Sequence, residues 1–244
     1  MSSSLIHRDL GMTDPDLVAN GLRRMIRWLS SDTVTNKRPV DFDQRRAELA
    51  DLEQKLLDLS ASDNEVLREL ASDALGAFLG DAALDRLLVL AQDPEERVRA
   101  SAVGALEGWP DETRARGILL ASAAAGHWTV RMRATRALQA YTGDDVIEVL
   151  MESLLDPDSY VRLAAADSLR RRDAALFRQR LRLLADYQAP HHLDAAIDLM
   201  GEVGTAEDAQ FLSKVGGWFN LSQPAFIRQW ARKSARKIRT RMGQ

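Results

Sequence analysis

The chain has 244 residues, which is enough for one large domain or two small ones. Its 45% hydrophobic and 28% charged residues are typical of a soluble globular protein. It contains no cysteine, which excludes disulfide bonds, thiolate metal sites and a cysteine nucleophile and favours a reducing cytoplasm. The first residues lack the basic and apolar regions of a secretory signal, and no run of ~20 apolar residues is present. We therefore expect a cytoplasmic protein without a membrane segment.

The first predicted element is a helix that begins at Asp14-Pro15 and ends near Leu29. Asp before Pro is a typical helix start, because the carboxylate accepts a backbone N–H and Pro at the first helical position loses no hydrogen bond. Residues 30–40, SSDTVTNKRPV, are predicted to form a loop or linker. We therefore expect residues 1–40 to form an N-terminal capping helix and linker, followed by a second domain over residues 41–244.

A repeat dominates the rest of the chain. After a long helix predicted near residues 41–60, four nine-residue segments align without gaps, each with arginine at its second position. Apolar or small residues occupy the first, fifth, eighth and ninth positions, which is the one-sided pattern of an amphipathic helix. The four segments are residues 67–75, 98–106, 130–138 and 161–169, and looser copies occupy residues 192–200 and 227–235.

The repeating unit is a pair of helices. Between the aligned segments the sequence predicts further helices over residues 81–91, 111–125 and 144–155. One pair cannot bury its apolar face alone, so neighbouring pairs must stack into a curved array. We therefore predict an all-α protein, a right-handed α-solenoid of about six helix pairs over residues 41–242.

An Asp-Pro turn, then Val-Arg, then Ala and Ala-Leu at these spacings resembles the HEAT-like repeats of a short bacterial class first associated with phycobiliprotein lyases. The resemblance is close over residues 62–171 and weak over residues 172–242. It implies that the second helix of each pair lines a concave face, and that Asp and Arg side chains of successive repeats form a structural ladder. The residues of this ladder would be Asp93, Arg99, Arg131, Asp156 and Arg162. Asp93 and Asp156, each followed by Pro, are also predicted helix caps.

The side chains that line the concave face are expected one, five and eight residues after the arginine of each repeat. At its centre this projection places Met132, Arg136, Gln139, Leu163, Asp167 and Arg170. Acidic residues lie toward both ends of the face, at Glu69 and Asp73 in one repeat and at Asp194 and Asp198 in another. A phosphate track would be basic along its length, so this mixed face favours a protein segment as the ligand.

The C-terminal end of the chain is strongly basic. Residues 209–244 contain eight basic and no acidic residues, whereas residues 1–208 contain 25 basic and 36 acidic residues. A helix over residues 226–239 is predicted to point its basic patch outward: Arg228, Arg232, Lys233, Arg236 and Lys237. This patch can bind nucleic-acid phosphates or an acidic protein surface, or it can form a solvated helical cap.

The sequence gives little support to the enzyme classes that use this architecture. The His-Glu pairs of HEAT-repeat iron hydroxylases are absent, and His191-His192 is more typical of a solvated helix start than of a metal site. A HEAT-like alkylpurine glycosylase needs tryptophans and a carboxylate, for which Trp128, Trp230 and Asp167 are formally available, but their spacing does not bring them together. A bilin-lyase activity is suggested only by the name of the repeat class.

We therefore expect a non-catalytic HEAT-repeat scaffold or adaptor, without metal or cofactor. It would bind a protein partner through its concave face and its basic C-terminal helix. The alternatives are a nucleic-acid-binding solenoid related to the alkylpurine glycosylases, or an assembly factor for a cofactor protein related to the bilin lyases. The oligomeric state and the identity of the partner stay open.

Overall fold

The computed structural model describes residues 3–29, 42–174, 177–179, 181–182, 190–217 and 224–243, with only the backbone described at residues 190–192. No strand occurs in this described part of the chain, and the predicted all-α solenoid is confirmed. The chain divides into two compact units, Met1–Gly143 and Asp144–Gln244. The handedness of the solenoid and the predicted domain boundary between residues 40 and 41 stay predictions.

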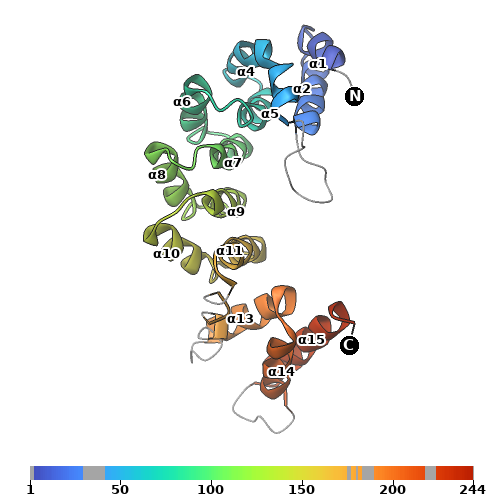
Figure 1. The fold of residues 1–244 in the computed structure, drawn as a ribbon, viewed down its shortest axis with the longest axis vertical. Helices are drawn as coiled ribbons and strands as arrows, with labels where there is room; N and C mark the ends of the chain where they lie inside the picture. The colour runs from blue at the N-terminus through green and yellow to red at the C-terminus, as the bar shows by residue number, and fades with distance from the viewer. Residues whose placement is uncertain are drawn as a thin grey trace. The chain divides into compact units, whose positions relative to one another are not determined.

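The first unit is built from two rows of helices. One row holds α4 (Glu53–Ser60), α6 (Asp81–Leu90) and α8 (Thr113–Ser122). The other row, the second-helix row, holds α2 (Pro15–Leu29), α5 (Glu65–Leu75), α7 (Glu96–Ala105) and α9 (Trp128–Ala137). Helices of the second-helix row pack against one another in this order (Figure 1). Short elements complete the unit: α1 (Ser3–Leu10), α3 (Phe42–Ala47), η1 (Ala50–Leu52), η2 (Leu106–Gly108) and η3 (Leu138–Ala140).

The N-terminal segment is a pair of helices where the sequence predicts one. The predicted helix α2 begins at Pro15, and the Asp14 carboxylate accepts the N–H of Asp16 at 2.9 Å. The additional helix α1 packs on α2, and α2 in turn packs against α5 as a member of the second-helix row. Burial of Ile6 and Leu10 on α1 explains this arrangement, because these side chains cover α2 and remove its apolar face from water.

The long helix predicted over residues 41–60 is wrong, because α3, η1 and α4 divide this segment. At η1 the N–H of Leu52 donates to the carbonyl of Leu49, a tighter turn than that of an α-helix. The predicted caps at Asp93 and Asp156 are also wrong. Helices α7 and α11 follow the N-caps Glu95 and Asp158, and the two Asp carboxylates instead accept the N–H groups of these residues at 2.9 and 2.8 Å.

Small residues allow the second-helix row to pack closely. Ala71, Ala102 and Ala134 stand at the fifth position of the repeat and are completely buried. Between α5 and α7 the approach is so close that a Cβ on Gly76 would lie 2.9 Å from the Cβ of Ala105. The predicted alanine positions therefore form the contact between repeats, as the helix periodicity requires.

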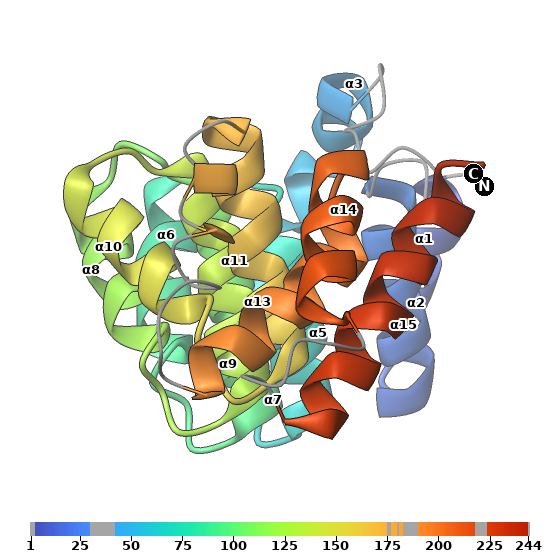
Figure 2. The same ribbon diagram turned by 90° about the horizontal axis from the view of Figure 1, so that it is seen from below.

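The second unit contains α10 (Asp144–Ser153), α11 (Ser159–Arg172), α13 (Pro190–Val203), α14 (Ala206–Val215) and α15 (Ala225–Arg241). Helix α10 pairs with α11, which contacts α13, and both α13 and α14 pack against α15. Figure 2 shows α14 and α15 side by side. A capping box begins α14, where the Asp208 carboxylate accepts the N–H of Thr205 at 2.8 Å.

Candidate functional site

The arginine of each repeat closes the turn before its own helix. In all four aligned repeats its Nη1 donates to the carbonyl oxygens six and five residues earlier, at 2.7–3.1 Å. These carbonyls lie in the turn between the two helices, where no helical N–H reaches them. The four residues are Arg68, Arg99, Arg131 and Arg162. They are structural residues.

The ladder between repeats differs from the prediction. The Asp93 carboxylate accepts from Nε and Nη2 of Arg68 at 2.9 and 3.1 Å, whereas Arg99 donates to the backbone carbonyl of Asp93. Burial alone would raise the pKa of Asp93, but hydrogen bonds from Arg68 and from the N–H of Glu95 lower it below its ordinary value. In the second unit Arg162 pairs with Asp198 at 2.7 Å. The ladder thus includes Arg68 and Asp198, which the predicted ladder did not contain, and Asp198 pairs with Arg162 although the projection placed it on the concave face.

A histidine joins adjacent second helices in the α9 repeat, where Ala125-Gly126 stand in place of the Asp-Pro pairs that precede α7 and α11. His127 Nδ1 lies 2.5 Å from Oε1 of Glu96 and 2.8 Å from Oγ1 of Thr129. Glu96 begins α7 and His127 caps α9, so this contact joins the same ends of adjacent second helices. A His–Glu contact thus joins these two repeats, in place of the Arg–Asp pair that joins others, at the point where the repeat sequence departs from its pattern.

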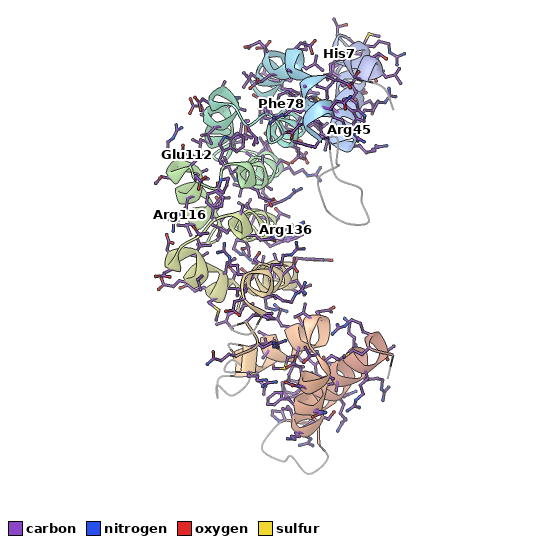
Figure 3. All side chains as sticks on the ribbon, viewed as in Figure 1. His7, Arg45, Phe78, Glu112, Arg116 and Arg136 are labelled. Atoms are coloured by element: carbon purple, nitrogen blue, oxygen red, sulfur yellow. The ribbon has the colours of Figure 1, made fainter. Side chains whose placement is uncertain are left out.

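Three further arginines on α7 and α9, namely Arg97, Arg133 and Arg136, make no side-chain hydrogen bond or ion pair with the part of the chain that the structure describes. Arg97 on α7 and Arg136 on α9 are exposed side chains of this kind. Figure 3 shows Arg136 on the side of α9 away from α8, which carries Arg116 and begins after its N-cap Glu112. Helix α7 therefore carries one arginine used in folding, Arg99, and one available to a partner, Arg97, while α9 carries Arg131 in the turn, Arg133 against α7 and Arg136 available to a partner.

A charged network extends across α5, α7 and α9. Burial raises the pKa of Asp73 on α5, and the charge of Arg133 on α9 and a hydrogen bond from Ser101 on α7 oppose this increase. Burial, together with the charge of Asp73, also raises the pKa of Glu69. Gly104 allows Arg133 to lie across α7, because a Cβ there would be 3.2 Å from its Cδ. Arg133 was missed because it stands two residues after Arg131, outside the projected positions.

The six projected face residues are divided between the units. In the first unit Arg136 is exposed and Met132 and Gln139 are half-buried. In the second unit, the remaining three lie on α11: Leu163, Asp167 and Arg170. The Asp167 carboxylate there accepts from Arg170 at 2.7 Å and from Arg171 at 2.8 Å. Arg136 is thus without an acidic partner in the described residues, whereas Arg170 has one.

Most of the cations on the basic C-terminal helix α15 have a structural role. Arg232 donates to the carbonyl of Gly216 at 2.8 Å, Arg239 donates to Oγ of Ser213 at 2.6 Å, and Lys237 pairs with Glu202. Arg241 donates to three carbonyl oxygens near the end of α13: those of Gly201, Glu202 and Gly204.

The predicted outward direction is therefore wrong for two members of the basic patch, Arg228 and Arg232, which are half-buried. Lys233, Arg236 and Lys237 are exposed as predicted. Of these, Lys233 and Arg236 have no hydrogen bond or ion pair within the described ranges.

Among the described residues, no group of three or more His, Asp or Glu side chains is arranged to hold a metal ion. The side chains of His191 and His192 lie outside the described set. No helix in the same set has the length and apolar character needed to cross a bilayer.

Comparisons with known proteins agree with the fold. The HEAT repeats family matches residues 52–139 and 98–170. The complex of CpcE and CpcF of phycocyanin lyase from Nostoc sp. PCC7120 is similar in structure, with a TM-score of 0.54, 17% identity, and coverage of 96% of this chain and 86% of that one. A designed armadillo repeat protein in complex with the peptide (KR)4 has a TM-score of 0.53 and 17% identity over 81% of this chain and 97% of its own. An engineered protein has a TM-score of 0.53 and 18% identity over 98% of both chains. No curated protein sequence matches this one.

Proposed function

Because the chain is a HEAT-like repeat protein, we propose that it is a non-catalytic scaffold that holds a segment of a partner protein against α7 and α9. One observation carries this proposal. Arg97 and Arg136 are exposed on adjacent second helices without a hydrogen bond or ion pair in the described residues, while Arg99 and Arg131 on the same helices bind turn carbonyls.

The chemistry of this face suits a protein ligand. Arginine binds a carboxylate through two parallel hydrogen bonds, and arginines are frequent among the residues that dominate binding energy in interfaces. Met132 stands one helical turn before Arg136 and is half-buried, so it offers an adaptable apolar contact beside the cation. An acidic residue next to an apolar residue in an extended or helical segment would match this pair.

The neighbouring network favours a partner segment of defined direction. Glu69 and Asp73 place acidic groups on α5, while Arg136 places a cation on α9. A bound segment that crosses the row would therefore meet acidic groups at α5 and a basic group at α9, and charge complementarity would select one orientation. The (KR)4 peptide complex and the CpcE–CpcF complex are similar structures with a peptide or protein partner, which supports the class of ligand.

Site-specific photo-crosslinking in the native host tests this proposal. A photoreactive amino acid replaces Met132 in one variant and Val89 in a matched control. Val89 is 60% exposed on α6, in the opposite row. We expect a discrete protein adduct from position 132 that disappears when Arg97→Glu and Arg136→Glu are added, and no such adduct from position 89.

Two results would contradict the proposal. An adduct at position 132 that survives both charge reversals would mean that these arginines do not hold the partner. A crosslink to nucleic acid would support the nucleic-acid-binding alternative. Circular dichroism of the double variant must match that of the wild type, since both substitutions are at exposed positions.

A further inference from the structure

The outward face of α15 carries a stripe that the fold does not use. Phe226, Gln229, Lys233 and Arg236 follow one another at spacings of three, four and three residues, which places them on one side of a helix, and all four are exposed. Phe226 is 62% exposed. The opposite side of the helix packs in the unit and carries the buried residues Ile227, Ala231, Ser234, Ala235 and Ile238. We call the four exposed residues the α15 stripe.

Other cations of α15 have structural roles, which the two cations of the α15 stripe do not have. Arg232, Lys237, Arg239 and Arg241 all bind groups on α13, on α14 or just after these helices. Arg232 and Arg241 satisfy carbonyl oxygens at helix C-termini, where cations are favourable, and Lys237 and Arg239 bind side-chain oxygens. Of the other three cations of α15, Arg228 is half-buried, and Lys233 and Arg236 are exposed without a side-chain hydrogen bond or ion pair in the described residues.

We propose that the α15 stripe is a second docking site, for an acidic protein segment that also presents an apolar side chain. Its carboxylates would pair with Lys233 and Arg236, and its apolar side chain would cover Phe226. Helix α15 contains no acidic residue, so nothing on the helix itself repels such a segment. Aromatic and arginine side chains are enriched at protein interfaces, and the stripe combines both.

Nucleic acid fits the stripe less well. Each phosphate contact contributes a slope of about −0.9 to the dependence of log affinity on log salt, so two cations supply a slope of only about −1.8. Binding of this kind is weak at physiological salt. The exposed Phe226 ring would also remain in water beside a duplex backbone, whereas an apolar side chain of a protein segment would bury it.

This site is independent of the face of α7 and α9. The α15 stripe belongs to the unit Asp144–Gln244, and Arg97 and Arg136 belong to the unit Met1–Gly143. Reversal of charge in one unit leaves the other surface chemically unchanged. Failure of this inference and failure of the proposed function are therefore distinguishable.

Fluorescence anisotropy with the full-length chain tests the inference, using two labelled probes at 50 mM salt. One probe is a helical peptide of Glu and Leu with one acidic and one apolar face, and the other is a 20-base-pair DNA duplex. The variants are Lys233→Glu with Arg236→Glu, Phe226→Ala, and the matched control Lys214→Glu. Lys214 is an exposed cation on α14 whose side chain makes no hydrogen bond or ion pair in the described residues.

We expect the charge-reversed double variant to bind the peptide at least about tenfold more weakly, Phe226→Ala to bind it about three- to tenfold more weakly, and Lys214→Glu to match the wild type. The variant Arg97→Glu with Arg136→Glu keeps the α15 stripe unchanged. A loss of peptide binding by this variant would therefore mean that the peptide binds the face of α7 and α9. Where the double reversal lowers the melting temperature, Lys233→Gln with Arg236→Gln replaces it.

Three outcomes would overturn the inference: no peptide binding by the wild type below 100 µM (on the order of a weak interface), equal loss with Lys214→Glu, or tighter binding of the duplex with a salt slope well beyond −2.

Discussion

Replacement of Arg68 by methionine measures what one rung of the ladder contributes to stability. Arg68 donates twice to the Asp93 carboxylate and twice to the carbonyls of its own turn. The Arg68 and Asp93 side chains are only 14% and 8% exposed, so water cannot replace the lost partner easily. Removal of one partner of a buried ion pair costs about 3–5 kcal/mol, and the residual exposure favours the lower end of this range. We expect a loss of about 3 kcal/mol in the free energy of unfolding.

A double-mutant cycle isolates the pair itself. Asp93→Asn keeps an oxygen that can accept the N–H of Glu95 but removes the charge, and the cycle with Arg68→Met should give a coupling of about 1–3 kcal/mol. Equilibrium urea unfolding followed by far-UV circular dichroism is the measurement. Arg114→Met is the control, because Arg114 pairs with Asp85 at 2.8 Å on an exposed surface and should contribute little.

The pH dependence supplies a second test of the same rung. Burial would raise the pKa of Asp93, but its hydrogen bonds from Arg68 and Glu95 outweigh burial and lower it below 3.8. A lowered pKa stabilises the fold above the unfolded value and loses this effect as pH falls through the folded value. Asp93→Asn should therefore flatten the stability curve below about pH 4. A wild-type melting midpoint in Arg68→Met, or an unchanged acid limb in Asp93→Asn, would refute the reasoning.

Four further predictions follow from the packing and the charges. Ala102→Asp should lower the free energy of unfolding by about 2–5 kcal/mol, because Ala102 is completely buried, and a melting point within a degree or two of wild type would contradict the register. Gly76→Ala should destabilise by about 1–3 kcal/mol, since its Cβ would lie 2.9 Å from a side-chain carbon of α7, and a more stable variant would disprove this contact. Hydrogen bonding to the Ser3 carbonyl and then to Asp51 raises the pKa of His7 above 6.5, so its contribution is full below pH 6.5 and is lost as pH rises through the folded pKa; His7→Gln should remove this loss in thermal melts. Duplex DNA with methylated purines should lose no base when it is incubated with the chain, and base release would contradict the non-catalytic assignment.

The helix pairs could be predicted because their signal is local. The four nine-residue segments lie in second helices or end in the 3-10 turn that follows, and their fifth-position residues Ala71, Ala102, Ala134 and Ala165 are completely buried. A period of 3.6 residues with one apolar side defines a helix and its buried face without knowledge of any distant residue. Helix α1 was not predicted, since its eight residues are too short for a reliable period.

The candidate sites could be predicted only in part. Projection along each helix correctly placed Arg136 and Asp73 on the second-helix row and the exposed cations Lys233 and Arg236 on α15. It missed Arg133, whose position depends on the absence of a side chain at Gly104 on the next helix.

The sequence alone determined that this is an array of helix pairs with a basic final helix, because periodicity and charge are properties of the chain itself. Only the tertiary structure decided which arginines are bound within the fold. Arg99 and Arg136 have the same side chain and lie on adjacent helices, yet Arg99 reaches two turn carbonyls and Arg136 does not. A guanidinium donates to nearby backbone carbonyl oxygens that lack another donor. The positions of those oxygens are set by the turns and by the packing of neighbouring repeats.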